Sequence, residues 1–249
     1  EVGGTCLNRG CIPAKAMIHA STLYREIKEA DRFGISASDV TYDFEKILEY
    51  KEQTTGQLVQ GVEQLLQANG VTRYYGKGTL FEGKKVKITG NEEQFVEAEN
   101  VILASGSKPL ILPIRGMDLP RVLTSDELFK LSEVPKSLVI IGGGVISVEF
   151  ATVYSALGSK VTILEAMPRL VPNMDKEIAQ NLKLILKKRG VESHTLAAVQ
   201  GVHMEGDTCV CTFVEKEKEQ TVEAEYVLCA VGRCPNTDGL FAEGAAPDM

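Results

Sequence analysis

The chain has 249 residues, of which 44% are apolar and 24% charged, and its formal net charge is -7 at pH 7. This composition is typical of a globular protein with one large domain or two ordinary ones. The negative charge argues against nucleic acid or an anionic membrane as the main partner, and no apolar run is long enough to cross a bilayer. Six cysteines are too few for a secreted disulfide scaffold, so we expect a reducing compartment and a cytoplasmic location.

Two helices are predicted in the first part of the chain. Apolar residues at helical spacing place one from Cys11 to about residue 31, with Pro13 in its first turn, where the missing N–H costs nothing. The second runs from about residue 43 to residue 68, and Asn69-Gly70 ends it. Short glycine-separated runs then predict strands at residues 71–75, 78–81 and 86–89, and an unbroken apolar run predicts a buried strand at residues 101–104.

The second part of the chain alternates strand and helix, which is typical of a parallel α/β sheet. Pro109, Pro113 and Gly116 predict a linker ahead of it. Strands are predicted at residues 137–141, 160–164, 192–196, 208–215 and 226–231, with helices at 145–157 and 175–188.

The turn Gly142-x-Gly144-x-x-Ser147 stands between a predicted strand and helix, the setting that a dinucleotide-binding turn requires. Its first glycine makes the tight turn, and the second lets the backbone approach a pyrophosphate at the helix N-terminus. The third position is usually Gly or Ala, so Ser147 is a mild departure. Glu165 ends the next strand about 20 residues on, where a carboxylate binds a ribose 2′-hydroxyl and repels a 2′-phosphate. The pattern favours NAD over NADP; the alternative is a plain turn with Glu165 at a solvated strand end.

Cys6 and Cys11 bracket four residues just ahead of a predicted helix, whose dipole favours thiolate over thiol. A zinc half-site would need two more ligands, and His19 and the distant Cys209/Cys211 pair are poor candidates. We therefore expect no metal. Two buried structural thiols are the other alternative to a redox pair.

The run Gly3-Gly4-Thr5-Cys6-Leu7-Asn8-Arg9-Gly10-Cys11-Ile12-Pro13-Ala14-Lys15 resembles the active-site signature of the pyridine nucleotide–disulfide oxidoreductases, in their dihydrolipoamide dehydrogenase branch. Three later runs fit the same family in the right order, and the match covers essentially the whole chain. They are Ala104-Ser105-Gly106-Ser107-Lys108-Pro109, Ile141-Gly142-Gly143-Gly144-Val145-Ile146-Ser147-Val148-Glu149 and Val231-Gly232-Arg233-Cys234-Pro235-Asn236.

The resemblance implies a redox-active disulfide. Cys6 would be the thiol that attacks the substrate disulfide, and Cys11 the charge-transfer thiol against the flavin. Lys15 would lie near flavin N5 and pair with Glu149, because a lysine there stabilises negative charge on the reduced flavin and the thiolate. Without the resemblance, Lys15 and Glu149 would be two solvated helix charges.

The resemblance also implies FAD and NAD as cofactors and names residues for each. The expected FAD contacts are Gly3, Gly4, Thr5, Lys15, Gly78, Ser105, Gly106 and Ser107, with Ser105 in place of the family's usual Thr. The expected NAD contacts are Gly142, Gly143, Gly144, Val145, Ile146, Glu149, Glu165, Val199 and Gly232.

The implied fold is α/β, with two Rossmann-like dinucleotide-binding domains, the FAD domain partial and the NAD domain complete. Residues 1–115 would form the partial FAD domain with the disulfide and the helical pair, residues 116–234 the NAD domain, and residues 235–249 the return to the FAD domain. Family members carry a first G-x-G-x-x-G before the cysteines and a His–Glu pair in a C-terminal dimerisation domain. Neither motif occurs here, so we expect a fragment that is inactive alone.

The implied activity of the parent protein is oxidation of dihydrolipoamide to lipoamide with NAD as acceptor. Its partners would be lipoyl groups of a 2-oxo acid dehydrogenase or glycine cleavage complex, and the parent would be a homodimer. The alternatives are an NAD(P)H-dependent disulfide or mercury reductase of the same family, and an NAD-binding fragment without turnover.

Overall fold

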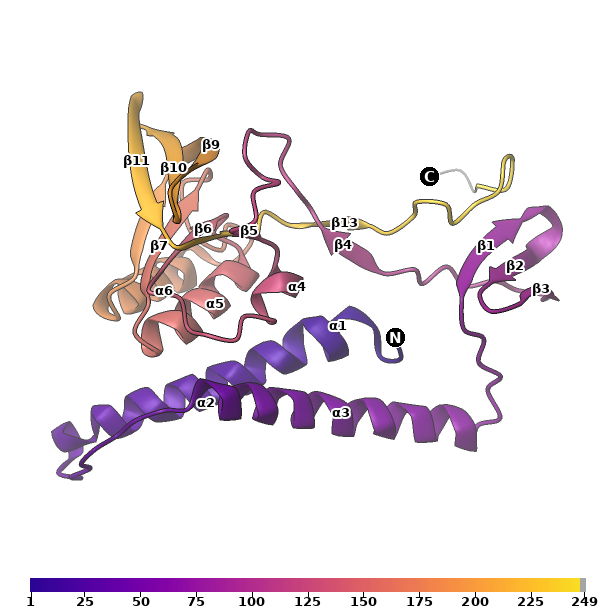
Figure 1. Cartoon of the computed structure of the whole chain (residues 1–249), viewed down its shortest axis with the longest axis horizontal. Coiled ribbons are helices and arrows are strands. Elements are labelled where there is room, and N and C mark those ends of the chain that lie inside the picture. The colour runs from indigo at the N-terminus through magenta and orange to yellow at the C-terminus, as the bar shows by residue number, and fades with distance from the viewer. Residues whose placement is uncertain (247–249) are drawn as a thin grey trace.

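The computed structural model describes residues 1–246 and begins with a pair of long helices (Figure 1). A short helix α1 (Gly4–Arg9) leads through Gly10 into α2 (Cys11–Lys28), and α3 (Phe44–Ala68) returns alongside it. The prediction of α3 is confirmed, and Asp43 caps it by accepting a hydrogen bond from the Lys46 N–H at 3.2 Å. The predicted first helix ends three residues early, because the chain tightens there into the 3₁₀ turn η1 (Ala30–Phe33).

A small antiparallel sheet follows, formed by β1 (Lys77–Phe81), β2 (Lys85–Thr89) and β3 (Glu93–Glu97), with the 3₁₀ turn η2 (Glu82–Lys84) between β1 and β2. Two of the three predicted strands are confirmed. The one at residues 71–75 is wrong, because that segment is extended but pairs with no strand among residues 1–246.

The predicted buried strand at residues 101–104 is also wrong. The segment has no strand partner in the described chain, and the side chain of Ile102 is 90% exposed. An apolar run predicts burial only if another element covers it, and within residues 1–246 none does.

A five-stranded parallel sheet forms the centre of the second part, in the order β5-β12-β6-β7-β8. Its strands are β5 (Val122–Leu123), β6 (Ser137–Ile141), β7 (Lys160–Glu165), β8 (Glu192–Thr195) and β12 (Tyr226–Cys229). The helices are α4 (Ser125–Leu128), α5 (Val145–Ala156) and α6 (Lys176–Lys188). This is the predicted α/β, Rossmann-like arrangement. The strands are parallel, and the order in which the chain adds them to the sheet switches from one side to the other between β6 and β12.

A second, antiparallel sheet covers the face of the parallel sheet opposite to α5. It consists of β9 (Ala197–Glu205), β10 (Thr208–Glu215) and β11 (Lys218–Ala224), in the order β11-β10-β9. The sequence analysis predicted β10 with its observed bounds but missed both neighbours. Their alternation is weak, since small residues interrupt β9 and β11 is mostly exposed and polar.

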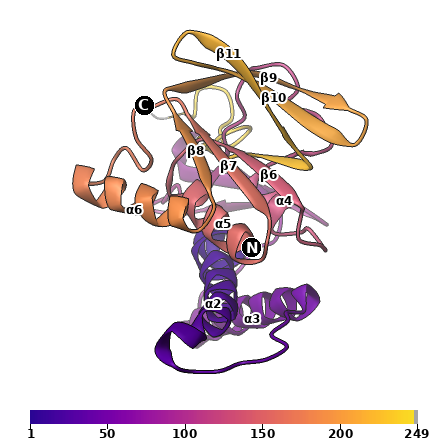
Figure 2. The same ribbon diagram turned by 90° about the vertical axis from the view of Figure 1, so that its left-hand side faces the viewer.

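The parallel sheet is therefore buried on both sides, with α5 between it and the helical pair (Figure 2). A hydrophobic core lies on each face of the parallel sheet, and alternate side chains of β6 pack into one or the other. Leu138 and Ile140 pack toward α5 and α2, whereas Val139 and Ile141 pack toward β9–β11. The buried amine of Lys51 in α3 donates to the Phe129 carbonyl at 2.9 Å, which ties the helical pair to the end of α4.

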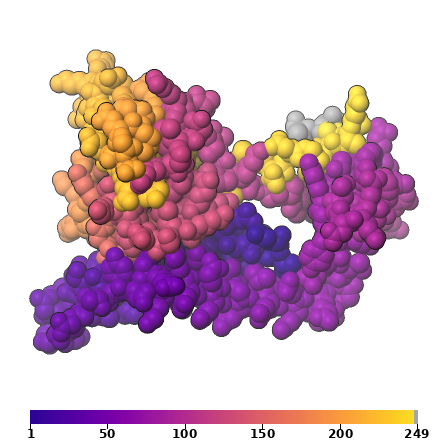
Figure 3. Space-filling view, in the orientation of Figure 1, coloured from indigo at the N-terminus to yellow at the C-terminus, as the bar shows by residue number. Residues whose placement is uncertain are grey.

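Two long connections join the parts of the molecule. Their strands β4 (Ser107–Pro109) and β13 (Arg233–Pro235) pair in antiparallel fashion. An opening lies between α1, α3 and the β1–β3 sheet (Figure 3). The expected boundaries at residues 115/116 and 234/235 stay predictions, and the segment predicted at residues 235–249 extends beyond the described residues. No helix in the described part of the chain is long and apolar enough to span a membrane.

One buried hydroxyl in α5 has no hydrogen-bond partner. Ser147 is fully buried, and its Oγ is unpaired in the described structure. We expect Ser147→Ala to raise the free energy of unfolding by about 1 kcal/mol, because it removes an unsatisfied buried polar group. Ser155→Ala is the matched control in the same helix, since the Ser155 hydroxyl is only partly buried and donates to the Thr152 carbonyl. Chemical denaturation of both variants measures the difference; equal effects would contradict the prediction.

Candidate functional site: a glycine turn and a cysteine pair

The glycine turn closes tightly because side chains are excluded at two of its positions. Gly142 has φ +99°, and a Cβ there would lie 2.5 Å from the Ala230 carbonyl oxygen. A Cβ at Gly143 would meet Leu170 and the Glu165 carboxylate. Gly144 precedes α5, has no side-chain cap, and faces open space. The backbone N–H groups at the start of α5 are thus accessible to an anion.

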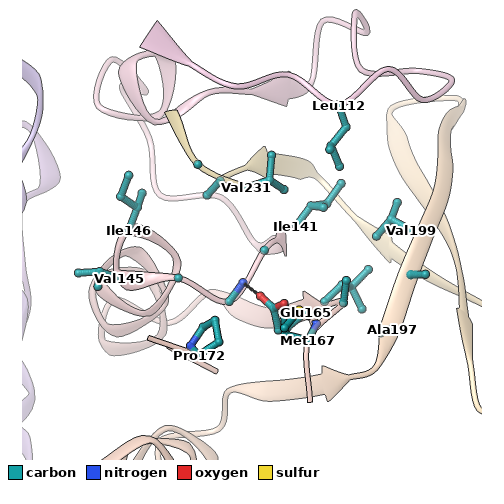
Figure 4. A pocket seen from close by; sticks show the side chains of 18 of the residues that line it. Leu112, Ile141, Val145, Ile146, Glu165, Met167, Pro172, Ala197, Val199 and Val231 are labelled. Carbon is teal, nitrogen blue, oxygen red and sulfur yellow. Dashed lines mark hydrogen bonds between the residues drawn. The ribbon is translucent and has the colours of Figure 1, made fainter. Parts of the chain in front are cut away.

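Glu165 lies at the end of β7, as predicted. It is only 7% exposed, so the alternative of a solvated strand end is wrong. One carboxylate oxygen accepts a hydrogen bond from the Gly143 N–H, and the other accepts from the Met167 N–H at 2.6 Å. The carboxylate therefore holds the glycine turn in place while it lines the adjoining cavity (Figure 4).

The cavity has a volume of about 620 Å³ and opens at the carboxyl ends of β6 and β7. This is where doubly wound α/β sheets bind nucleotides. The structure brings together there eight of the nine residues predicted for NAD: Gly142, Gly143, Gly144, Val145, Ile146, Glu165, Val199 and Gly232. Glu149, the ninth, does not line the cavity and lies one turn along α5.

Sequence reasoning missed the loop after β7. Met167, Pro172 and Asn173 line the cavity, and the Val171 N–H donates to the Gly143 carbonyl at 2.7 Å. Val171 has φ +42°, a rare conformation for a β-branched residue. Two prolines near Glu165 were the available signal for an irregular loop, but its folding back onto the turn depends on tertiary contacts.

The cavity fits a dinucleotide by this chain's own features. A helix N-terminus without a cap, a glycine that leaves open space before it, and a carboxylate at the neighbouring strand end are the parts that such a ligand needs.

Cys6 and Cys11 lie on two different helices. Cys6 lies within α1, which the sequence analysis did not expect, and Cys11 is the first residue of α2. At Gly10 a Cβ would lie 2.9 Å from the Thr5 carbonyl oxygen, so this glycine allows the sharp turn between the helices. Both cysteines are free and exposed, which rules out two buried structural thiols.

The two thiols lie close enough to influence each other. A hydrogen bond to the Cys6 side chain, together with desolvation, raises the pKa of the Cys11 thiol, while the positive charge of Lys15 opposes the shift. Such proximity is what a reversible dithiol–disulfide pair requires.

Lys15 and Glu149 form an ion pair with Nζ and Oε1 2.5 Å apart. Lys15 lies one turn after Cys11 in α2, and Glu149 lies in the first turns of α5. The pair therefore links the helix that starts at Cys11 with the helix that starts at the glycine turn.

The residues predicted for FAD are not gathered into one pocket in the described structure. Gly3, which precedes α1, has φ +87°, and Gly4, its first residue, has φ +63°. Gly106 has φ +76° ahead of β4, so each of the three has a conformation that favours glycine. Gly78 lies in β1, across the opening of Figure 3 from α1. Thr5, Ser105 and Ser107 flank these glycines, with Ser107 Oγ accepting from Arg233 Nε at 2.8 Å.

Asp126 in α4 joins the cysteine segment to the later part of the chain, and the sequence analysis missed it. Its carboxylate lies 3.6 Å from Arg9 Nη1 and 3.8 Å from Arg233 Nη1. No motif marks this residue, because the two arginines approach it only through the fold.

Thiol accessibility separates the six cysteines. Burial raises the pKa of Cys209, Cys229 and Cys211, to about 12 for Cys211. At pH 8 we expect an aromatic disulfide reagent to modify the exposed Cys6 fastest and the exposed Cys11 more slowly, because its raised pKa lowers its thiolate fraction. The partly exposed Cys234 should also react slowly, and the three buried thiols should be protected. Denaturant should expose all six. Peptide mass spectrometry identifies the modified cysteines. Rapid modification of Cys209, Cys211 or Cys229 in the native protein would contradict their burial.

Comparison with known proteins agrees with this geometry. The family model "Pyridine nucleotide-disulphide oxidoreductase" matches residues 1–248. A dihydrolipoyl dehydrogenase of Bacillus subtilis (strain 168) is 40% identical over all of this chain and 55% of that protein. The dihydrolipoyl dehydrogenase of Geobacillus stearothermophilus is 41% identical over 98% of this chain and 52% of its own length. The chain thus spans about half the length of these relatives.

Solved structures show the same fold. The HOCl-induced flavoprotein disulfide reductase RclA from Escherichia coli has a TM-score of 0.79 at 28% identity, over 96% of this chain and 50% of that one. Its Cu(II) complex has a TM-score of 0.80 at 27% identity, over the same shares. The chain belongs to the pyridine nucleotide-disulphide oxidoreductase family.

Proposed function

We propose that this chain carries the dithiol and the NAD site of an FAD-dependent enzyme that oxidises dihydrolipoamide to lipoamide. The observation that carries the proposal is the coexistence of a close, exposed thiol pair and a dinucleotide-type cavity, joined by the Lys15–Glu149 ion pair. Relatives that are about 40% identical over the whole chain are named dihydrolipoyl dehydrogenases. Because the chain spans about half of them, the complete activity is proposed for the whole protein.

The family's cofactors, FAD and NAD(H), supply hydride chemistry that no side chain provides. In this chain the N–H groups at the start of α5 would hold the NAD pyrophosphate, and Glu165 would accept from the adenosine ribose hydroxyls. Gly3, Gly4, Thr5, Gly78 and the Ser105–Ser107 turn would contribute to the FAD site from three separate segments.

The cysteines would exchange one disulfide with the substrate. When Cys6 and Cys11 are disulfide-bonded, a thiolate of dihydrolipoamide attacks Cys6 and Cys11 leaves as thiolate. The second substrate thiol then displaces Cys6, so lipoamide gains the S–S bond and the protein gains two electrons and two protons. Lys15 would stabilise the departing Cys11 thiolate, since its positive charge opposes the rise in the pKa of that thiol caused by Cys6 and desolvation.

We also propose lipoyl groups of a 2-oxo acid dehydrogenase or glycine cleavage complex as the macromolecular partner, and a homodimer for the whole protein. The support is the name shared by the relatives, and the cysteines lie exposed, where a lipoyl arm would reach them.

Disulfide exchange tests the cysteine assignment without any cofactor. The chain is oxidised with diamide, mixed with dihydrolipoamide, and the product is quantified by chromatography. We expect about one lipoamide per chain, because a single reactive disulfide takes up one electron pair. Cys6→Ser and Cys11→Ser should each abolish stoichiometric conversion.

Cys234→Ser is the matched control, since Cys234 is partly exposed but distant from the pair in sequence. It should retain full conversion. Unchanged conversion by Cys6→Ser would instead favour a module that binds NAD without redox turnover.

Coenzyme preference tests the role of Glu165. Calorimetric titration should give an affinity for NAD at least about tenfold higher than for NADP, because the carboxylate repels a 2′-phosphate. Glu165→Gln should reduce the ratio of NAD affinity to NADP affinity, since it removes the negative charge but keeps an oxygen that can accept a hydrogen bond from the glycine turn. Glu192→Gln, at the exposed start of β8, should leave it unchanged. Preference for NADP in the unmodified chain would favour the NADPH-linked reductase alternative.

A further inference from the structure

A second cavity, distant from the glycine turn, is lined by an excess of positive charge. It has a volume of about 340 Å³ and lies where α2, α5 and α6 all end. Four of its lining residues are cationic: Arg25 and Lys28 from α2, and Lys188 and Arg189 at the end of α6. Ser155 and Ala156 of α5 complete the wall.

The lining contains one acidic side chain to balance these four cations. That residue, Glu29, already pairs with Arg32 at 3.2 Å. Across residues 1–246, none of the four lining cations forms an ion pair with a carboxylate. Like charges placed together without counter-charges repel one another, and a bound anion removes that cost.

Two atomic observations indicate that the positive charge of the cavity is only partly compensated. Nη1 of Arg25 is buried and has no hydrogen-bond partner in the described structure. In addition, desolvation and the nearby charge of Arg25 lower the pKa of Arg189, against the opposing effect of the Glu29 carboxylate. A buried guanidinium N–H without an acceptor is rare, because it loses its bond to water without replacement.

The ends of the three helices explain only part of this arrangement. Cations near a helix C-terminus are favoured by the helix dipole, by about 0.3–1 kcal/mol each. The carbonyls there are mostly occupied already, since the Glu29 N–H bonds to Arg25 O and the Arg189 N–H bonds to Ile185 O. The dipole does not supply an acceptor to Arg25 Nη1.

We propose that this basic cavity, lined by Arg25, Lys28, Lys188 and Arg189, binds the phosphate group of a small molecule or free inorganic phosphate. A phosphate dianion offers several acceptor oxygens, which suits two guanidinium groups and two amines that approach from different helices. The cavity is large enough for a phosphorylated small molecule.

Such a ligand would bridge the two parts of the chain. Arg25 and Lys28 belong to the helix that begins at Cys11, whereas Lys188 is the last residue of α6 and Arg189 follows it. Bound phosphate would therefore stabilise the docking of α2 on α5 and α6, and with it the positions of Lys15 and Glu149.

Titration of the full chain with inorganic phosphate and with glycerol 3-phosphate, by calorimetry at constant ionic strength in chloride, tests the proposal. We expect binding of at least one of them. The double variant Arg25→Gln/Arg189→Gln should weaken it at least about tenfold, because it removes two charge-assisted hydrogen-bond donors. Tighter binding of the ester identifies a phosphorylated small molecule as the ligand; equal binding identifies free phosphate.

Lys46→Gln/Arg73→Gln is the matched control, since it removes the same charge at exposed pairs elsewhere. It should bind as the unmodified chain does. NAD affinity should stay within about twofold in both double variants, which checks the fold. If the arginine variant does not fold, the exposed Lys188→Gln replaces it. Binding of neither probe overturns the proposal. Equal binding in the arginine and control variants also overturns it, because it would place the phosphate elsewhere, for example at the glycine turn, where these substitutions have no effect.

Discussion

The packing of α2 along α5 is the contact on which both functional parts depend. The small residue Ala14 on α2 allows the approach. Ala14 is buried and Met17 completely so, and both lie in the core that contains Val148 and Ala151 of α5. The first residue of α2 is Cys11, and the first turn of α5 follows the glycine turn. One helix–helix interface thereby sets the position of the thiols relative to the dinucleotide cavity. The Lys15–Glu149 pair lies at this interface, so packing and electrostatics act at the same place.

The exposed ion pair by itself contributes little to stability. Lys15 is 59% exposed at its side chain, and pairs of this kind are worth about 0–1 kcal/mol. Its importance is electrostatic and local, because Lys15 lies one turn from Cys11 and its charge opposes the rise in the pKa of that thiol caused by Cys6 and desolvation. Stability of the interface comes instead from the buried apolar residues. The buried Lys51 amine adds a hydrogen bond elsewhere, between α3 and the end of α4.

Glu165 has a structural role in addition to the ligand-binding role that the sequence pattern predicts. Its carboxylate accepts N–H groups from both the glycine turn and the following loop, so it organises the cavity as well as lining it. A carboxylate bonded in this way has a defined orientation, which is what discrimination between a hydroxyl and a phosphate needs. The same region contains the strained Val171, whose N–H completes the bonding of Gly143. The turn is thus held from both sides before any ligand arrives.

The sequence alone was sufficient for the α/β class, the βαβ unit around Gly142–Gly144 and the helix beginning at Cys11, because these depend on local periodicity and on glycines required by backbone geometry. It was also sufficient for the family. It failed at residues 101–104, where apolar character predicted burial but no element of the described chain covers the segment. It missed β9, β11, Asp126 and the loop after β7, since these are defined by partners that are remote in sequence. The basic cavity could not be predicted either: two of its cations belong to α2 and two lie at the end of α6, and only the packing of these helices brings the like charges together.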